Sequence, residues 1–156
     1  MTELSIGSPA PDFSLPRDGG GTVSLADFSG KRLVLYFYPK DDTSGCTVEA
    51  KAFSEHAAAF KAAGAAILGV SPDPVKSHDK FVKKHELAIP LGADEDQAVC
   101  NAYGVWVEKS MYGKKYMGVE RSTFLIGPDG RIEKIWPKVK VAGHVEEVLA
   151  AVTAGN

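Results

Sequence analysis

The sequence predicts an α/β protein with a central mixed sheet and helices on both of its faces. Two apolar stretches, residues 33–38 and 65–71, are typical of buried strands. Between them, residues 46–64 carry apolar side chains at helical spacings of three and four, from Ala50 to Phe60. A strand, a helix and a strand of these lengths predict a right-handed crossover between parallel strands.

The segment before the first buried strand predicts an N-terminal hairpin. Residues 6–11 form an extended, proline-containing lead-in, because residues before proline avoid the helical region. Residues 13–15 and 22–25 have the composition of short strands, with the glycine-rich stretch 18–21 between them. No Lys-Ser or Lys-Thr pair follows these glycines and no helix opens there, so they indicate a turn and not a phosphate-binding loop.

The segments after residue 71 complete the sheet. After a turn at Ser71–Pro74 we expect a helix with Phe81 and Val82 on its core face, and then an extended piece at Ile89–Ala93. A second helix is expected from its cap at Asp94–Asp96 to Gly104. The chain then predicts a hairpin of Val119–Ile126 and Arg131–Trp136 around Gly127–Gly130, and a last helix at Gly143–Thr153. This order predicts a thioredoxin-like fold with an N-terminal hairpin extension. No linker, repeat or low-complexity stretch divides it, so residues 1–156 are expected to form a single domain.

Composition and charge narrow the function classes. A formal net charge of −2 gives no indication of a nucleic-acid or membrane partner. The N-terminus has no secretory signal pattern, no apolar run is long enough to span a membrane, and two cysteines on different elements suit a reducing cytoplasm.

The histidines give no indication of a metal site. Their spacings match no metal-ligand pattern, so we expect neither a metal nor another cofactor. Two of them lie seven residues apart on one helix face and are expected to be solvated or partly buried. The four are His56, His78, His85 and His144, and the pair on one face is His78 and His85.

Cys46 occupies a position with chemical consequences. Pro39 ends the first buried strand because it has no N–H for the ladder, and the polar loop 41–45 supplies helix-capping residues. Cys46 then falls in the first turn of a helix, where unpaired N–H groups and the helix dipole favour the nucleophilic thiolate. Thr43 can place its hydroxyl beside the sulfur. The alternative is a cysteine that only fills a small apolar space, which the polar loop disfavours.

The spacing Pro39-x-x-x-Thr43-x-x-Cys46 resembles the active-site pattern of peroxiredoxins. The longer run from Tyr36 to Ala50 is similar to the bacterioferritin-comigratory-protein branch, also called peroxiredoxin Q. The stretches 10–13 and 102–106 extend the resemblance to nearly the whole chain. It implies a thiol-dependent peroxidase that reduces hydrogen peroxide and organic hydroperoxides through a sulfenic acid on Cys46.

The resemblance also implies roles for the neighbours of Cys46. Thr43 would accept a hydrogen bond from the peroxide and direct its own proton at the sulfur. The N–H groups of Gly45 and Cys46 would hold the peroxide oxygens, and Pro39 would cap the pocket. From the pattern alone, Pro39 could be only a strand terminator and Thr43 only an N-cap.

Arg121 is the cation that the resemblance places beside the sulfur, reached from the neighbouring strand. Its guanidinium is planar and permanently charged, so it would stabilise both thiolate and peroxide. Without the resemblance a strand arginine is usually a surface charge. Glu49 lies one turn after Cys46, where an unpaired carboxylate would oppose the thiolate. We therefore expect Glu49 to bind Arg121 and not the substrate.

The sequence departs from the family at the second cysteine. Many members have one five residues after the first, where this chain has Lys51, and others have one in the next helix, where residues 81–83 contain none. Cys100 is the only other thiol. We predict a one-cysteine mechanism in which thioredoxin, glutaredoxin or glutathione reduces the sulfenic acid.

Three alternatives remain open from sequence. One is a two-cysteine mechanism with a Cys46–Cys100 disulfide, which requires Cα atoms within about 7 Å. A thiol-disulfide oxidoreductase would normally need Cys-x-x-Cys, and this chain has Glu49 at the fourth position. The third is a non-catalytic thioredoxin-like binding module.

Residues 108–118 are rich in lysine, tyrosine, methionine and glycine and predict an exposed, mobile loop. Met111, Tyr112, Tyr116 and Met117 could form an apolar wall near the site that tolerates organic hydroperoxides, or belong to an ordinary packed surface loop. The resemblance implies a monomer or a weak dimer.

Overall fold

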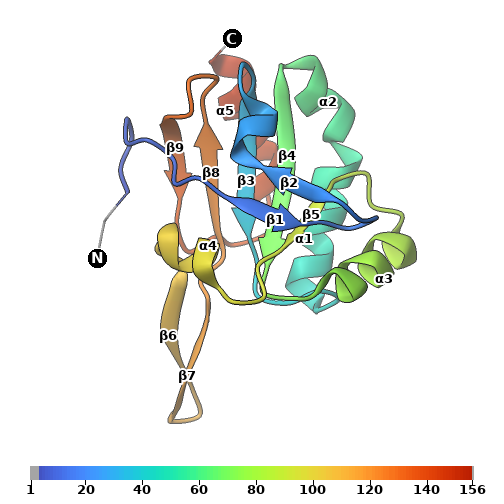
Figure 1. Ribbon diagram of the computed structural model, residues 1–156, viewed down its shortest axis with the longest axis vertical. Coiled ribbons are helices and arrows are strands. Elements are labelled where there is room, and N and C mark those ends of the chain that lie inside the picture. The colour runs from blue at the N-terminus through green and yellow to red at the C-terminus, as the bar shows by residue number, and fades with distance from the viewer. Residues whose placement is uncertain (1–3, 156) are drawn as a thin grey trace.

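The computed structural model describes residues 4–155. A five-stranded mixed sheet of order β5-β4-β3-β8-β9 forms its centre (Figure 1). The strands are β3 (Arg32–Phe37), β4 (Ala65–Ser71), β5 (Leu91–Ala93), β8 (Ser122–Ile126) and β9 (Ile132–Trp136). β3, β4 and β5 are parallel to one another, and β8 and β9 run antiparallel to their neighbours, so the predicted mixed thioredoxin-like sheet is confirmed.

β3 is buried on both faces because it lies in the middle of the sheet. Its alternate side chains enter two separate apolar cores, with Tyr36 on one side and Leu35 and Phe37 on the other. Helices α1 (Ser44–Glu55), α2 (Ala57–Ala62), α3 (Val75–His85) and α5 (His144–Ala154) supply the core on the Tyr36 side.

The opposite face is covered by shorter elements. These are the N-terminal hairpin of β1 (Ser14–Pro16) and β2 (Thr22–Ser24), the 3-10 turn η1 (Leu25–Phe28), and α4 (Ala98–Ala102). Figure 1 shows the hairpin crossing one face of the sheet, with α1 on the far side. Among residues 4–155, no helix has the length and apolar character needed to cross a membrane.

The helix expected over residues 46–64 is two helices. α1 ends at Glu55 and α2 begins at Ala57, with His56 between them at φ −96° and ψ 3°. The His56 ring hydrogen-bonds to the carbonyl oxygen of Ala52 at 2.9 Å. The ring therefore competes with backbone N–H groups for the Ala52 carbonyl oxygen. The spacing of apolar residues alone could not predict this break between α1 and α2.

The helix expected from residue 94 begins later, at Ala98. The Asp94 carboxylate still caps it, since the N–H groups of Val99 and Cys100 donate to its two oxygens at 3.1 and 2.7 Å. The strand expected over 119–126 is interrupted as well, with Glu120 and Arg121 lying between the end of β7 and the start of β8.

Residues 106–119 form a hairpin and not the expected loop. β6 (Trp106–Met111) pairs antiparallel with β7 (Lys114–Val119), and the hairpin extends away from the body of the protein (Figure 1). Tyr112 and Gly113 at its tip have φ of 52° and 78°, as a type I′ turn requires. Met111, Tyr112, Tyr116 and Met117 are each at least 44% exposed, as expected for this segment, and their role as an apolar wall near the site stays a prediction.

Candidate active site

Cys46 is the third residue of α1, the helix that follows the loop after the carboxyl end of β3. Tyr38 still donates its N–H to the Val70 carbonyl at 3.1 Å, and Pro39 then ends the ladder. The Cys46 side chain is directed into the core and only 1% of the residue is exposed. Within residues 4–155, no acceptor pairs with the N–H groups of Gly45 and Cys46, so both can donate to a ligand.

Arg121 lies directly beside the sulfur. Ser122 pairs with Phe37 in the β3–β8 register, which brings Arg121 to the edge of the sheet where α1 begins. Its carbonyl accepts a hydrogen bond from Val139 N–H at 2.8 Å, which fixes the backbone. The Nη2 group of Arg121 donates to Cys46 Sγ at 3.2 Å. The fold therefore brings together the cysteine and the arginine that are 75 residues apart in the chain.

Glu49 holds the other side of the guanidinium. Arg121 Nη1 donates to Glu49 Oε1 at 2.7 Å, so the expected pair is present. Burial alone would lower the pKa of Arg121, but the charges of Glu49 and Cys46 raise it, and the guanidinium stays cationic. Among the described residues, Glu49 Oε2 and Tyr36 OH are buried without a hydrogen-bond partner.

The pKa of Glu49 is raised from 4.5 to about 7, because burial disfavours its charge more than Arg121 stabilises it. The folded state therefore binds this proton more tightly than the unfolded chain does. The contribution of Glu49 to stability is complete below the unfolded pKa and is lost as the pH rises through about 7.

Replacing Glu49 by glutamine should remove this pH dependence. The amide oxygen can still accept from Arg121, but no buried charge forms. From pH 5 to 8 we expect the unfolding free energy of E49Q to gain about 3 kcal/mol on the unmodified protein, the energy of the pKa shift. Chemical denaturation across this range measures it, with the exposed Glu55→Gln on the same helix as control. A difference that stays flat with pH would contradict the assignment.

Thr43 precedes α1 and is exposed, and its hydroxyl does not donate to the sulfur as expected. It donates to the carbonyl of Lys40 at 2.8 Å, and it makes no capping hydrogen bond to the helix. Since the proton is committed to the carbonyl, the oxygen lone pairs are left to accept. The acceptor role remains a prediction, and the proton-directing role is wrong.

Gly45 is needed for space and not for a left-handed backbone. A Cβ at this position would lie 3.2 Å from Arg121 Nη2 and 3.9 Å from Val141 Cγ2. A Cβ at position 45 would therefore push the guanidinium back by a few tenths of an ångström. Pro39 is half-buried, and its role as a cap of the pocket remains a prediction.

The Gly45→Ala variant should reduce peroxide reactivity without unfolding the protein. Alanine favours the helix by up to about 1 kcal/mol, but it displaces the guanidinium by a few tenths of an ångström. We expect a peroxide rate constant lowered roughly three- to tenfold with an unchanged or higher melting temperature. The exposed neighbour Ser44→Ala is the matched control. An unaltered rate in Gly45→Ala would show that this contact does not matter.

Cys100 lies on the other side of the sheet from Cys46. Cys46 belongs to the core shared with Tyr36, whereas Cys100 belongs to the core shared with Leu35 and is fully buried. Burial raises the pKa of the Cys100 thiol well above its usual range, and Asp94 raises it further. Both cysteines are free thiols.

Sequence reasoning missed a set of polar residues at the catalytic loop, residues 38–43 between β3 and α1: Asp41 lies in this loop, and Asp73 and His78 hydrogen-bond to it. His78 was expected to be solvated or partly buried, but it is fully buried because Asp41 gives it a partner, while the side chain of His85 is 16% exposed. The sequence did contain a signal that Asp41 and Asp73 lie close together. Each follows one of two neighbouring parallel strands, β3 and β4, and the carboxyl ends of parallel strands meet at one edge of a sheet.

Comparison with known families agrees with this geometry. The AhpC/TSA family matches residues 6–135. Peroxiredoxin Bcp of Xanthomonas campestris is 51% identical over 156 residues, covering 99% of this chain and 98% of its own length. Peroxiredoxin Bcp of Bacillus subtilis is 50% identical, covering 94% of this chain and 93% of its own.

Solved structures of peroxiredoxins are also similar to this chain. A mutant of the Xylella fastidiosa PrxQ superposes with a TM-score of 0.94 at 42% identity, covering 99% of each chain. The bacterioferritin comigratory protein of Xanthomonas campestris, studied for its alkyl peroxide reduction activity, gives a TM-score of 0.90 at 49% identity over 97% of each chain. This chain therefore belongs to the AhpC/TSA family and, within it, to the Bcp or Q peroxiredoxins, which are thiol-dependent peroxidases.

Proposed function

We propose that this peroxiredoxin reduces hydrogen peroxide and organic hydroperoxides through a sulfenic acid on Cys46. The contact of Arg121 Nη2 with Cys46 Sγ at 3.2 Å is the observation that carries the proposal. It places a fixed cation where the thiolate and the peroxide both carry negative charge. The alkyl peroxide reduction studied in the Xanthomonas campestris relative supports organic hydroperoxides as substrates.

The step needs no group beyond those on the chain and the substrate. The thiolate of Cys46 attacks one peroxide oxygen, an S–O bond forms, and the O–O bond breaks. The sulfur is oxidised to the sulfenic acid, and the leaving alkoxide or hydroxide takes a proton from solvent to become alcohol or water. Thr43 accepts from the peroxide O–H, while Arg121 and the N–H groups of Gly45 and Cys46 donate to the oxygens that gain charge. Pro39 restricts access beside the thiol.

The sulfenic acid is then reduced by an external thiol. Cys100 is the only other thiol of the chain, and it lies fully buried in the other core with its thiolate disfavoured. A Cys46–Cys100 disulfide would require the sheet to open between them. We therefore assign a one-cysteine mechanism, with thioredoxin, glutaredoxin or glutathione as reductant and a monomer or weak dimer as the active form.

Mass analysis under non-reducing conditions tests this proposal. After one equivalent of peroxide and a sulfenic-acid trap such as dimedone, we expect one adduct on the peptide containing Cys46 and none on that containing Cys100. An internal disulfide in most molecules would overturn the one-cysteine mechanism but leave the peroxidase assignment. Turnover assays with each reductant supplied separately then identify the physiological class.

A further inference from the structure

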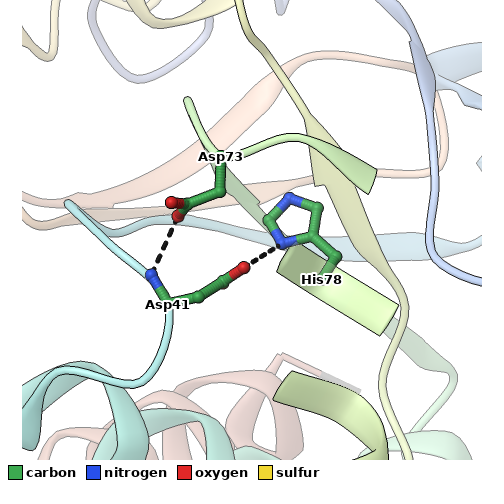
Figure 2. A group of neighbouring side chains, drawn as sticks. All are labelled: Asp41, Asp73 and His78. Atoms are coloured by element: carbon green, nitrogen blue, oxygen red, sulfur yellow. Dashed lines mark hydrogen bonds and ion pairs between the residues drawn. The ribbon is translucent and has the colours of Figure 1, made fainter. Parts of the chain in front are cut away.

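Asp41 of the catalytic loop forms a hydrogen-bonded group with Asp73 and His78 (Figure 2). Asp41 belongs to the loop between β3 and α1, Asp73 to the loop after β4, and His78 to α3. One atom from each lies within 4.8 Å of the others. This spacing could suit a cation, so the partners of each atom decide what the group does.

His78 donates from both ring nitrogens. Nδ1 lies 2.7 Å from Asp41 Oδ2, and Nε2 lies 3.0 Å from the carbonyl oxygen of Gly92. A carbonyl can only accept, so Nε2 must carry a proton, and the carboxylate receives the proton on Nδ1. Burial alone would lower the pKa of His78, but Asp41 raises it above the ordinary value. With a proton shared between His78 Nδ1 and Asp41 Oδ2, the two side chains form an ion pair in this structure.

The carboxylate of Asp41 is fully occupied by donors. Besides His78, the hydroxyl of Tyr38 donates to Oδ1 at 2.6 Å and the hydroxyl of Ser77 donates to Oδ2 at 2.7 Å. Asp41 is 7% exposed, and His78 is fully buried. The side chain of Asp41 is therefore held both to Tyr38, just past the end of β3, and to α3, and losing one of these partners would leave its buried charge less well paired.

The backbone of Asp41 is held separately by Asp73. The N–H of Asp41 donates to Asp73 Oδ2 at 2.8 Å, and the same oxygen accepts from the Ser71 hydroxyl at 2.6 Å. That N–H belongs to the peptide unit whose carbonyl is the carbonyl of Lys40. Because a peptide unit is planar, fixing its N–H also fixes the direction of its C=O.

The carbonyl of Lys40 is the group that accepts the proton of the Thr43 hydroxyl, at 2.8 Å. The direction of this carbonyl thus decides where the Thr43 proton points, and so where its lone pairs point. We propose that Asp73 and His78 are positioning residues for Thr43: they hold residue 41 by its backbone and its carboxylate, and thereby turn the Thr43 oxygen toward the peroxide as an acceptor. The inference rests on the proposed peroxidase function and adds two residues to it.

A double-mutant cycle tests the coupling. We would measure the peroxide rate constant of the reduced protein for Asp73→Ala and His78→Gln, each alone and combined with Thr43→Val. If both residues act through Thr43, each single variant lowers the rate constant at least about tenfold, yet changes it less than about twofold when Thr43 is already valine.

Two further measurements separate positioning from general loss of structure. Alkylation of Cys46 by iodoacetamide needs the thiolate but not the Thr43 acceptor, so it should change less than threefold in the same variants. Asp79→Ala is the matched control, because its carboxylate on α3 also accepts a backbone N–H, that of Gly19 at 2.7 Å, and within residues 4–155 it makes no hydrogen bond to the catalytic loop. We expect its peroxide rate constant to stay within about twofold.

Distinct results would overturn distinct claims. A peroxide rate constant unchanged by Thr43→Val would remove the acceptor role on which the inference rests. An effect of Thr43→Val with none from Asp73→Ala, or an Asp73→Ala loss that persists in full beside Thr43→Val, would overturn the positioning role alone. His78→Gln supplies the same comparison where Asp73→Ala does not show a cooperative melting transition, and Asp73→Ala supplies it where His78→Gln does not.

Discussion

Replacing Cys46 by serine abolishes peroxide reduction. The serine hydroxyl stays protonated beside Arg121 and is a weak nucleophile, while the remaining thiol, Cys100, is buried in the other core. We expect the fast phase of peroxide consumption to disappear, a loss of at least about a thousandfold, as for removal of a catalytic nucleophile. Stopped-flow mixing of the reduced protein with hydrogen peroxide measures it directly.

The control for this variant is Cys100→Ser. It buries a hydroxyl at a site that is fully enclosed, so it should lower the free energy of unfolding by about 1 to 3 kcal/mol while leaving the fast phase intact. The reverse pattern, with the fast phase lost in Cys100→Ser and kept in Cys46→Ser, would show that Cys100 is the reactive thiol and would contradict the mechanism.

Replacing Arg121 by glutamine has the second-largest expected effect. Glutamine keeps one donor but loses the charge, and Arg121 Nη2 donates to the sulfur while Nη1 donates to Glu49. Removing one such preorganised donor costs about a hundred- to a thousandfold in rate. We expect a loss of that size in the peroxide rate constant measured by stopped flow.

The same variant should also be less stable, which requires a control. Without Arg121, the pKa of the buried Glu49 carboxyl rises further, so the group takes up a proton and loses its charged hydrogen-bond partner, which costs about 1 to 3 kcal/mol. The double variant Arg121→Gln/Glu49→Gln places two neutral amides side by side that can hydrogen-bond to each other, so it should recover most of the stability but not the rate. Arg131→Gln, at an exposed arginine just before β9, should alter neither. Recovery of the rate together with the stability would show that Arg121 acts only through folding.

The sequence predicted the central sheet because the residue patterns of its strands and turns are unambiguous. Residues 33–38 are buried on both faces and therefore form a continuous apolar run, and the Gly127–Gly130 turn gives the last hairpin directly. The β6–β7 hairpin was missed for the opposite reason. Val119 is the one buried residue of these two strands, so they show no apolar alternation, and pairing with each other is what makes them strands.

The site was predictable where the chemistry is local and less so where it depends on packing. The position of Cys46 follows from the strand, Pro39 and the start of the helix, which are adjacent in sequence. Arg121 could be proposed only through resemblance, because the β3–β8 register that brings it near is not encoded in neighbouring residues. The direction of the Thr43 proton depends on Lys40, and thus on a peptide orientation that spacing cannot show.

The most direct measurement of the central claim is the second-order rate constant for oxidation of the fully reduced protein by hydrogen peroxide near neutral pH. Arg121, Thr43 and the free N–H groups of α1 should together make Cys46 react at least about a thousandfold faster than a small free thiol, since each preorganised donor contributes a factor of this order or somewhat less. A rate constant no larger than that of the small thiol would contradict the account.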